Sequence, residues 1–96
     1  MIGDSATAMA KFHLHLVSDA TGDTLLSLAT AALAQFEGVE PDRHMWPMVR
    51  SEVYMAPVIA AIEKNPGLVM FTLVDHHLQE MLREECRRLQ VPCVPV

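Results

Sequence analysis

Apolar and polar residues alternate near the start of the chain, between Lys11 and Val17. Two histidines, His13 and His15, are interleaved with the apolar positions of this segment. A period of two is typical of a β-strand, so we expect a strand over these seven residues. Residues 1–10 show no such period and are expected to form a flexible tail.

The period lengthens to three and four residues after Asp19, which is typical of an amphipathic helix. This helix is predicted from Thr21 to Glu37, where Gly38 supplies a C-terminal stop. Its apolar face is expected to consist of Leu25, Ala29, Ala32, Leu33 and Phe36.

A second apolar cluster, between Asp42 and Arg50, is interrupted by Pro47. Proline cannot donate to the hydrogen-bond ladder of a sheet, so it is tolerated on an edge strand or at a bulge. We therefore expect an edge strand here. Its Trp46 is interpreted either as an anchor for another chain or as a residue packed under the first helix.

A helix is predicted after this strand, with Ser51 as its N-cap and with residues 65–67 at its end. Pro57 fits there only if the regular helix begins near Ala56, and otherwise it kinks the first turns. The apolar face of this helix consists of Met55, Val58, Ile59 and Ile62.

The last third of the chain predicts a strand, a helix and a further strand. Leu68 to Val74 is a nearly continuous apolar run, which is typical of a central strand covered on both faces. Asp75 is a candidate N-cap for the following helix, and Val91 to Val96 is expected to be the fourth strand. The apolar face of the helix consists of Leu78, Met81, Leu82, Cys86 and Leu89.

Alternation of strands and helices at this spacing predicts an α/β fold with parallel strands and right-handed crossovers. Placing the proline-bearing second strand at an edge gives a Rossmann-like, three-layer, four-stranded sheet of order 2-1-3-4 with three helices. The fold is expected to be truncated, because no helix follows the last strand. Residues 11–96 are thus predicted to form one α/β domain of a larger protein.

The charge balance argues against a nucleic-acid partner. Seven basic and twelve acidic residues give a formal net charge of −5, and no basic face is apparent. No run approaches the roughly 18 apolar residues of a membrane span, and the first ten residues do not resemble a signal peptide. With two cysteines, interpreted as reduced thiols, these features predict a cytoplasmic protein with no membrane partner.

Ligands of open α/β sheets bind beyond the carboxyl ends of the strands, where the winding direction reverses. In the predicted order this point lies between the first and third strands. The carboxylates gathered there would repel a bare phosphate unless Arg50 or a second domain supplied positive charge. The turn after the first strand either holds an anion at the helix N-terminus or merely caps the helix, and both interpretations stay open. The candidate ligand- or interface-binding residues are Ser18, Asp19, Thr21, Gly22, Thr24, Arg50, Asp75 and His76.

Neither a metal site nor a complete catalytic site is expected. His76 and His77 are neighbours on a predicted helix and point in different directions, and no third ligand has suitable spacing. His13 and His15 share one strand face and are interpreted as hydrogen-bonded core or rim residues. The chain also lacks a nucleophile–base–acid arrangement and a phosphate-binding P-loop, so we predict no catalytic residue and no cofactor within it.

Four segments of the chain resemble the regulatory proteins of phosphoenolpyruvate synthase and pyruvate, phosphate dikinase. The segments are Phe12 to Thr24, with the signature Ser18-Asp19-Ala20-Thr21-Gly22, then Ala31 to Phe36, then Trp46 to Arg50, and then Asn65 to Val74. The resemblance covers about residues 11 to 96, and the Ser-Asp-x-Thr-Gly piece is its most specific part.

The resemblance implies a bifunctional enzyme that phosphorylates a threonine of the dikinase or synthase with ADP. The same enzyme would remove that phosphate with inorganic phosphate, releasing pyrophosphate. The family's P-loop lies in a later, C-terminal kinase domain that this sequence lacks, so the chain looks like an N-terminal fragment. The implied partners are the dikinase or synthase and the missing kinase domain. Only Ser18, Asp19, Thr21 and Gly22 carry over as signature residues, without assigned roles.

A rival hypothesis is a stand-alone binding module of the receiver or flavodoxin type. Asp19 and Asp75 mimic the paired acidic sites of a receiver, but a lysine after a later strand is missing and Asp75 begins a helix at once. Under the leading hypothesis, apolar surface left exposed where the missing domain docks predicts a homo-oligomer.

Overall fold

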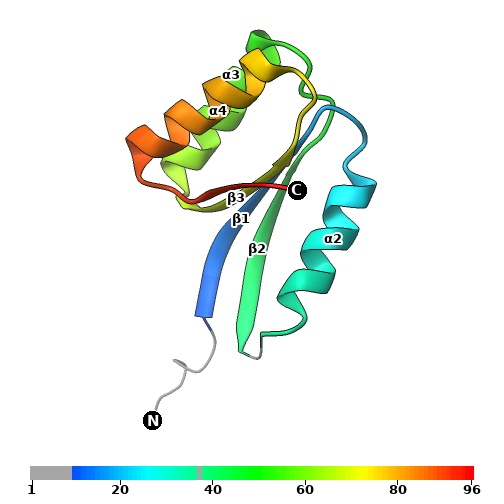
Figure 1. The fold of residues 1–96 in the computed structure, drawn as a ribbon. Helices are drawn as coiled ribbons and strands as arrows, with labels where there is room; N and C mark the ends of the chain where they lie inside the picture. Colours follow the sequence, from blue (N-terminus) through cyan, green and yellow to red (C-terminus); the bar gives the residue numbers. More distant parts are fainter. Residues whose placement is uncertain (1–9, 37) are drawn as a thin grey trace.

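The computed structural model describes residues 10–36 and 38–96. Seven elements follow one another along the chain and form the three layers visible in Figure 1. They are β1 (Ala10–Ser18), α2 (Asp23–Leu33), β2 (Val39–Trp46), α3 (Glu52–Lys64), β3 (Gly67–Thr72), α4 (His76–Leu89) and β4 (Cys93–Pro95). The predicted tail lies outside the described residues except for Ala10, which opens β1.

The four strands form one parallel sheet in the order β2-β1-β3-β4. This confirms the predicted α/β fold class, the strand order and the edge position of the second strand. β1 and β3 are central, and β1 pairs with β2 along eight residues, from Ala10 opposite Val39 to Val17 opposite Trp46. The winding therefore reverses between β1 and β3, as the sequence predicted.

Two apolar clusters cover the two faces of the sheet. Helices α3 and α4 lie together on one side, and α2 lies on the other (Figure 1). Because side chains alternate along a strand, neighbouring residues of β1 serve different clusters. The α3–α4 cluster contains Val17, Val49, Met55, Val58, Ile62, Val69, Phe71, Leu73, Leu78, Leu82, Cys86 and Val91. The α2 cluster contains Leu14, Leu16, Leu25 and Ala29.

Helix α2 is shorter than predicted at both ends. Gly22 has a left-handed φ of 89° and is the N-cap, so Thr21 lies outside the helix. At the other end, the amides of Gln35 and Phe36 bond to carbonyls only three residues back, which tightens the chain into a turn. The change of pitch turns Phe36 outward, where it is 60% exposed. Ala32 is exposed as well. The prediction that Phe36 and Ala32 belong to the apolar face of the helix is therefore wrong.

Strand β2 occupies Val39–Trp46 rather than residues 42–50. After Val39 its residues as far as His44 are polar or proline and carry no hydrophobic period, but their backbone pairs with the buried strand β1. Pro47 ends the strand instead of interrupting it, because it has no N–H to donate. Met48 follows with a left-handed φ of 60°.

Helix α3 begins at Glu52, so the condition that it start near Ala56 is not met and Pro57 lies inside it. The helix loses only the bond that the missing N–H would have made to the carbonyl of Val53. Val53 is 78% exposed, and water can therefore satisfy that carbonyl. Ser51 holds the N-cap position as predicted, but its side chain makes no capping bond.

The remaining elements follow the prediction closely. Leu73 and Val74 fall just outside β3, and β4 is limited to Cys93–Pro95. Asp75 caps α4 as predicted, since its carboxylate accepts the N–H of Leu78 at 3.0 Å. The buried face of α4 includes Leu78, Leu82 and Cys86.

Replacement of Gly67 by alanine is expected to destabilise the fold by about 2–3 kcal/mol, because the added methyl group has no free space between β3 and β1. A Cβ at Gly67 would lie 2.0 Å from the carbonyl oxygen of His13, which belongs to the backbone of β1 and cannot move aside. Urea unfolding of Gly67→Ala should show a lower midpoint, whereas exposed Ala60→Gln on α3 serves as the control. Equal midpoints for the glycine variant and the wild type would contradict the expected clash.

Candidate functional site

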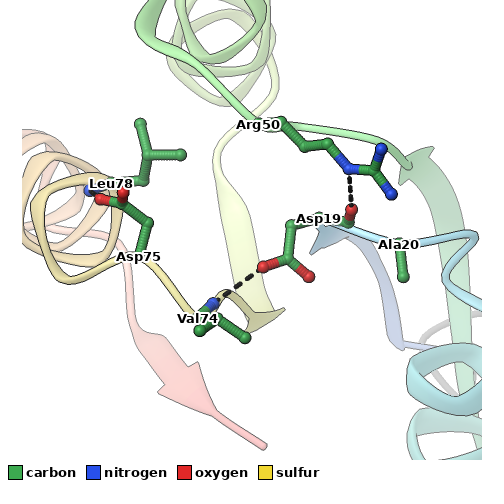
Figure 2. A pocket seen from close by; sticks show the side chains of 6 residues that line it. All are labelled: Asp19, Ala20, Arg50, Val74, Asp75 and Leu78. Carbon is green, nitrogen blue, oxygen red and sulfur yellow. Dashed lines mark hydrogen bonds between the residues drawn. The ribbon is translucent and has the colours of Figure 1, made fainter.

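A pocket of about 480 Å³ opens at the carboxyl ends of β1 and β3, where the winding reverses. It is built from the loops that follow β1, β2 and β3 and from the first turn of α4 (Figure 2). Its lining residues are Asp19, Ala20, Arg50, Val74, Asp75 and Leu78.

Asp19 joins two of these loops. Its carboxylate accepts the backbone N–H of Val74 at 2.8 Å (Figure 2). Its own N–H donates to the carbonyl of Thr72 at 3.3 Å. A charged acceptor strengthens the bond to Val74. The loop after β1 and the loop after β3 are therefore fastened together by one side chain and one backbone amide.

Arg50 comes to the pocket because the chain after β2 is bound to the loop after β1. The amides of Met48 and Val49 donate to the carbonyls of Ala20 and Ser18, each at 2.9 Å. Nε of Arg50 then donates to the carbonyl oxygen of Asp19 at 2.8 Å. Among the described residues Arg50 forms no ion pair, so its two terminal nitrogens remain available to a ligand.

Ser18 supports the pocket from below rather than lining it. Its side chain is buried, and its hydroxyl oxygen accepts the amide of Ala20 at 3.0 Å and the hydroxyl of Thr72 at 3.3 Å. Serine at this position therefore fixes the backbone turn that delivers Asp19. A ligand in the pocket does not reach this hydroxyl without rearrangement of the turn.

The turn before α2 combines two features. Gly22 is the N-cap and provides no side chain, and a Cβ there would lie 2.9 Å from Cε of Met45 besides requiring a positive φ. The hydroxyl of Thr21 accepts the amide of Asp23 at a long 3.5 Å. Thr21 and Thr24 are exposed, and neither they nor Gly22 line the pocket.

Asp75 lines the pocket while it caps α4, so one of its oxygens is engaged by the helix. His76, the first residue of α4, is exposed and does not line the pocket. His77 lies nearby on the surface, where its Nε2 is 2.7 Å from Oε2 of Glu52. Of the predicted residues, the structure brings together Asp19, Arg50 and Asp75.

Sequence reasoning did not single out Ala20, Val74 and Leu78 as lining residues. None of them carries a side-chain group that would mark it, and their places depend on how the loops after β1 and β3 face the first turn of α4. Leu78 also belongs to the α3–α4 cluster, so the floor of the pocket is continuous with the core.

A second group of polar side chains lies on the α3–α4 face of β1 and β2. His15 is fully buried, with its Nε2 2.8 Å from the carbonyl of Asn65 and its Nδ1 accepting the indole N–H of Trp46 at 3.2 Å. These partners fix a neutral ring that donates from Nε2. The interpretation of His15 as a hydrogen-bonded core residue is confirmed, and packing of Trp46 under α2 is wrong because Trp46 lies on the opposite face.

Burial lowers the pKa of His15 below its ordinary value of 6.5. The bond to the carbonyl of Asn65 opposes this shift, and nearby His44 and His13 add to it. The His44 ring stacks on His15 with ring centroids 4.6 Å apart, so a charge on either ring disfavours a charge on the other.

Taken together, the molecule is an open α/β domain with a pocket of mixed charge at its switch point. Asp19 and Asp75 place negative charge at this rim, and Arg50 places positive charge between the loops. In the part of the chain that the structure describes, every helix is too short or too polar to cross a membrane.

The chain belongs to the kinase/pyrophosphorylase family, whose model matches residues 14–96. It is 55% identical over 89 residues to a protein of Paramagnetospirillum magneticum and 51% identical over 86 residues to one of Erythrobacter litoralis. A protein of Agrobacterium fabrum is 48% identical over 85 residues. All three carry the name pyruvate, phosphate dikinase regulatory protein.

These matches cover 93%, 90% and 88% of this chain but only 29%, 31% and 31% of the respective relatives. The chain thus spans about a third of the length of the curated relatives it matches. Membership of this family confirms the resemblance and decides against the receiver or flavodoxin hypothesis.

The stability of the fold is expected to fall as the pH drops below 6.5, in part through His15. Its pKa is lowered in the folded state, so between that value and 6.5 the unfolded chain binds the proton more readily and unfolding is favoured. His15→Gln, whose amide can keep both hydrogen bonds, should flatten the dependence of the unfolding free energy on pH.

Exposed His76→Gln is the matched control and should leave that dependence unchanged. A ring titration followed by NMR supplies a direct check. Titration of His15 at or above its ordinary value would contradict the expectation.

Proposed function

We propose that this chain is part of a bifunctional regulatory enzyme acting on pyruvate, phosphate dikinase or phosphoenolpyruvate synthase. The enzyme phosphorylates a threonine of its target with ADP and removes the phosphate with inorganic phosphate, releasing pyrophosphate. The description of the family as kinase/pyrophosphorylase and the name shared by the relatives support this proposal. ADP and inorganic phosphate are proposed as substrates of the whole protein, and a cytoplasmic location agrees with the two free thiols.

The part proposed for this chain is one wall of the cleft in which phosphate is transferred. The observation that carries it is the placement of Arg50, whose Nε is bound to the Asp19 carbonyl while its terminal nitrogens stay available at a pocket of about 480 Å³. A fixed guanidinium suits a phosphoryl oxygen, because it offers paired donors and a permanent charge.

The carboxylates constrain what the pocket accepts. Asp19 and Asp75 repel a bare phosphate, so the pocket suits a target hydroxyl or a phosphoryl group whose charge is partly neutralised elsewhere. The nucleotide itself is proposed to bind to a P-loop in the rest of the protein. Asp19 serves here as a positioning residue, since its carboxylate holds the loop after β3 and its carbonyl holds Arg50.

An apolar surface next to the pocket supports docking of a protein at this rim. A second hollow of about 270 Å³ shares Arg50 and is lined also by Pro47, Met48 and Tyr54. Met48 and Tyr54 are exposed, as expected for a surface that another protein or domain covers. The exposed residues Thr21, Thr24 and His76 flank the pocket along the chain and are proposed as contacts to the target or to the kinase domain, whereas Gly22 is buried and shapes the turn.

Substitution of Arg50 tests the proposed cleft. In the full-length protein that contains this chain, Arg50→Gln should lower the rate of ADP-dependent phosphorylation of purified dikinase by about 100-fold, the scale of losing one charged contact in a transition state. Arg50→Lys keeps the positive charge but loses the paired N–H donors of the guanidinium, so it should retain only part of the phosphorylation rate. The label is followed from ADP carrying radioactive β-phosphate.

The matched control is Arg87→Gln, which removes an exposed arginine paired with Glu84 on α4. Thermal unfolding of each variant shows whether the fold survives. A folded Arg50→Gln protein with the wild-type rate would refute the role of this pocket, whereas an inactive wild type would refute the proposed activity itself.

Substitution of Asp19 separates its charge from its hydrogen bond. Asp19→Asn can still accept the N–H of Val74, whereas Asp19→Ala cannot, so Ala should lower the phosphorylation rate much more than Asn does. Unfolding experiments on the two variants give the structural part of the effect. Full activity of Asp19→Ala would reduce this carboxylate to a dispensable link between loops.

We also propose that the chain self-associates. Strand β4 lies at an edge of the sheet, and Val94 and Val96 beside that edge are 41% and 48% exposed. Sedimentation velocity should show a fraction of dimer that rises with protein concentration. Val94→Lys should lower this fraction in favour of the monomer. A monomer over the whole concentration range would contradict this.

A further inference from the structure

Three side chains that the sequence analysis did not group together converge on the face of the sheet opposite α2. His13 belongs to β1, and Asp42 and His44 belong to β2. The register places His13 directly opposite Asp42, and His44 diagonally from it on the same strand face. The three ligand atoms lie within 4.8 Å of one another.

The spacing of these atoms matches the edges of a metal coordination sphere. Nδ1 of His13 is 3.0 Å from Nε2 of His44, and Oδ2 of Asp42 is 3.6 Å and 4.0 Å from these two nitrogens. Bonds of about 2.0 Å give ligand–ligand distances of roughly 3.3 Å in a tetrahedral site and roughly 2.9 Å in an octahedral one. An ion placed among the three atoms therefore needs shifts of only tenths of an ångström.

One of the ligands is held rigidly by the core. The ring of His44 stacks on His15, which is fixed in turn by Trp46 and by the carbonyl of Asn65. The side chain of His44 is 25% exposed and that of His13 35%, so solvent ions reach the cluster. A metal centre of this kind needs both an ordered support and an open side.

The geometry points to a binding site for a divalent transition-metal ion, represented by Zn²⁺, at His13, Asp42 and His44. Two imidazoles and one carboxylate favour such an ion over Mg²⁺ or Ca²⁺, which prefer oxygen ligands. Asp42 is 68% exposed, so the remaining coordination positions face solvent or a ligand from outside the chain. The simpler alternative is a hydrogen bond between the two histidines with no bound metal.

Bound metal would tie the edge strand β2 to the central strand β1 through side chains as well as backbone. Because an ion that binds only the folded state stabilises it, Zn²⁺ should raise the melting temperature. This inference does not depend on the proposed function, since the cluster lies away from the pocket at the carboxyl ends of the strands.

The test uses the untagged chain, stripped with a chelator and dialysed, and titrated with ZnCl₂ in a calorimeter. One equivalent of Zn²⁺ should bind and raise the melting temperature. Each of His13→Gln, Asp42→Asn and His44→Gln should weaken binding at least about tenfold, since even second-shell changes at metal sites have effects of that size. The control His77→Gln removes a histidine of the exposed His77–Glu52 pair and should bind as the wild type does.

Circular dichroism shows which variants fold, and the exposed Asp42→Asn provides a ligand change that leaves the buried network intact. Binding of Co²⁺ gives a second measurement, because its visible absorption reports nitrogen and oxygen ligation and should disappear in the same variants. Absence of Zn²⁺ binding by the wild type would overturn the inference. Binding that persists in folded Asp42→Asn and His44→Gln, or that is lost in His77→Gln, would overturn it as well.

Discussion

Pairing of β1 with a parallel neighbour on each side is the constraint on which the rest of the structure depends. β2 and β3 both bond to it, and its residues from Leu14 to Ser18 are buried. A strand in this position must serve two apolar clusters with alternate side chains, so helices are required on both faces. The carboxyl end of β1 then necessarily opens at the switch point, where its loop meets the loop after β3.

The sequence predicted the features that depend on local chemistry or on period. The alternation of β1, the apolar run of β3 and the capping carboxylate of Asp75 each carry a signal within a few residues, and all three are confirmed. The strand order was inferred from the alternation of strands and helices and from the position of Pro47. This order placed Asp19 and Asp75 at the same rim of the sheet. The start of β2 carried no clear local signal, and the stop signal of Gly38 placed the end of α2 too late. These boundaries depend on backbone pairing with β1 and on a change of helical pitch near Phe36.

The same distinction explains which contacts of the candidate site were foreseen. The sequence named Arg50 only as a candidate source of positive charge for this rim. Its bond to the carbonyl of Asp19 arises from the way Met48 and Val49 attach to the loop after β1. The histidine cluster was missed for a related reason. His13 and His44 are 31 positions apart, and only the register of β1 on β2 brings them together. A shift of that register by one residue would turn Asp42 and His44 to the α2 face.

The two polar groups of the molecule differ in how their charges are balanced. At the rim, Arg50 lies among carboxylates that are already engaged by backbone amides, so the loops are held in place while the guanidinium keeps donors free. In the histidine cluster, burial favours the neutral form of His15, so the charge of the proposed metal ion would be balanced by Asp42. His13 is five residues before Ser18, which is roughly 16 Å along an extended strand, so the two groups act on different parts of the surface. A partner that covers the apolar residues beside Arg50 would therefore close the pocket without covering the histidines, and the domain can present both at once.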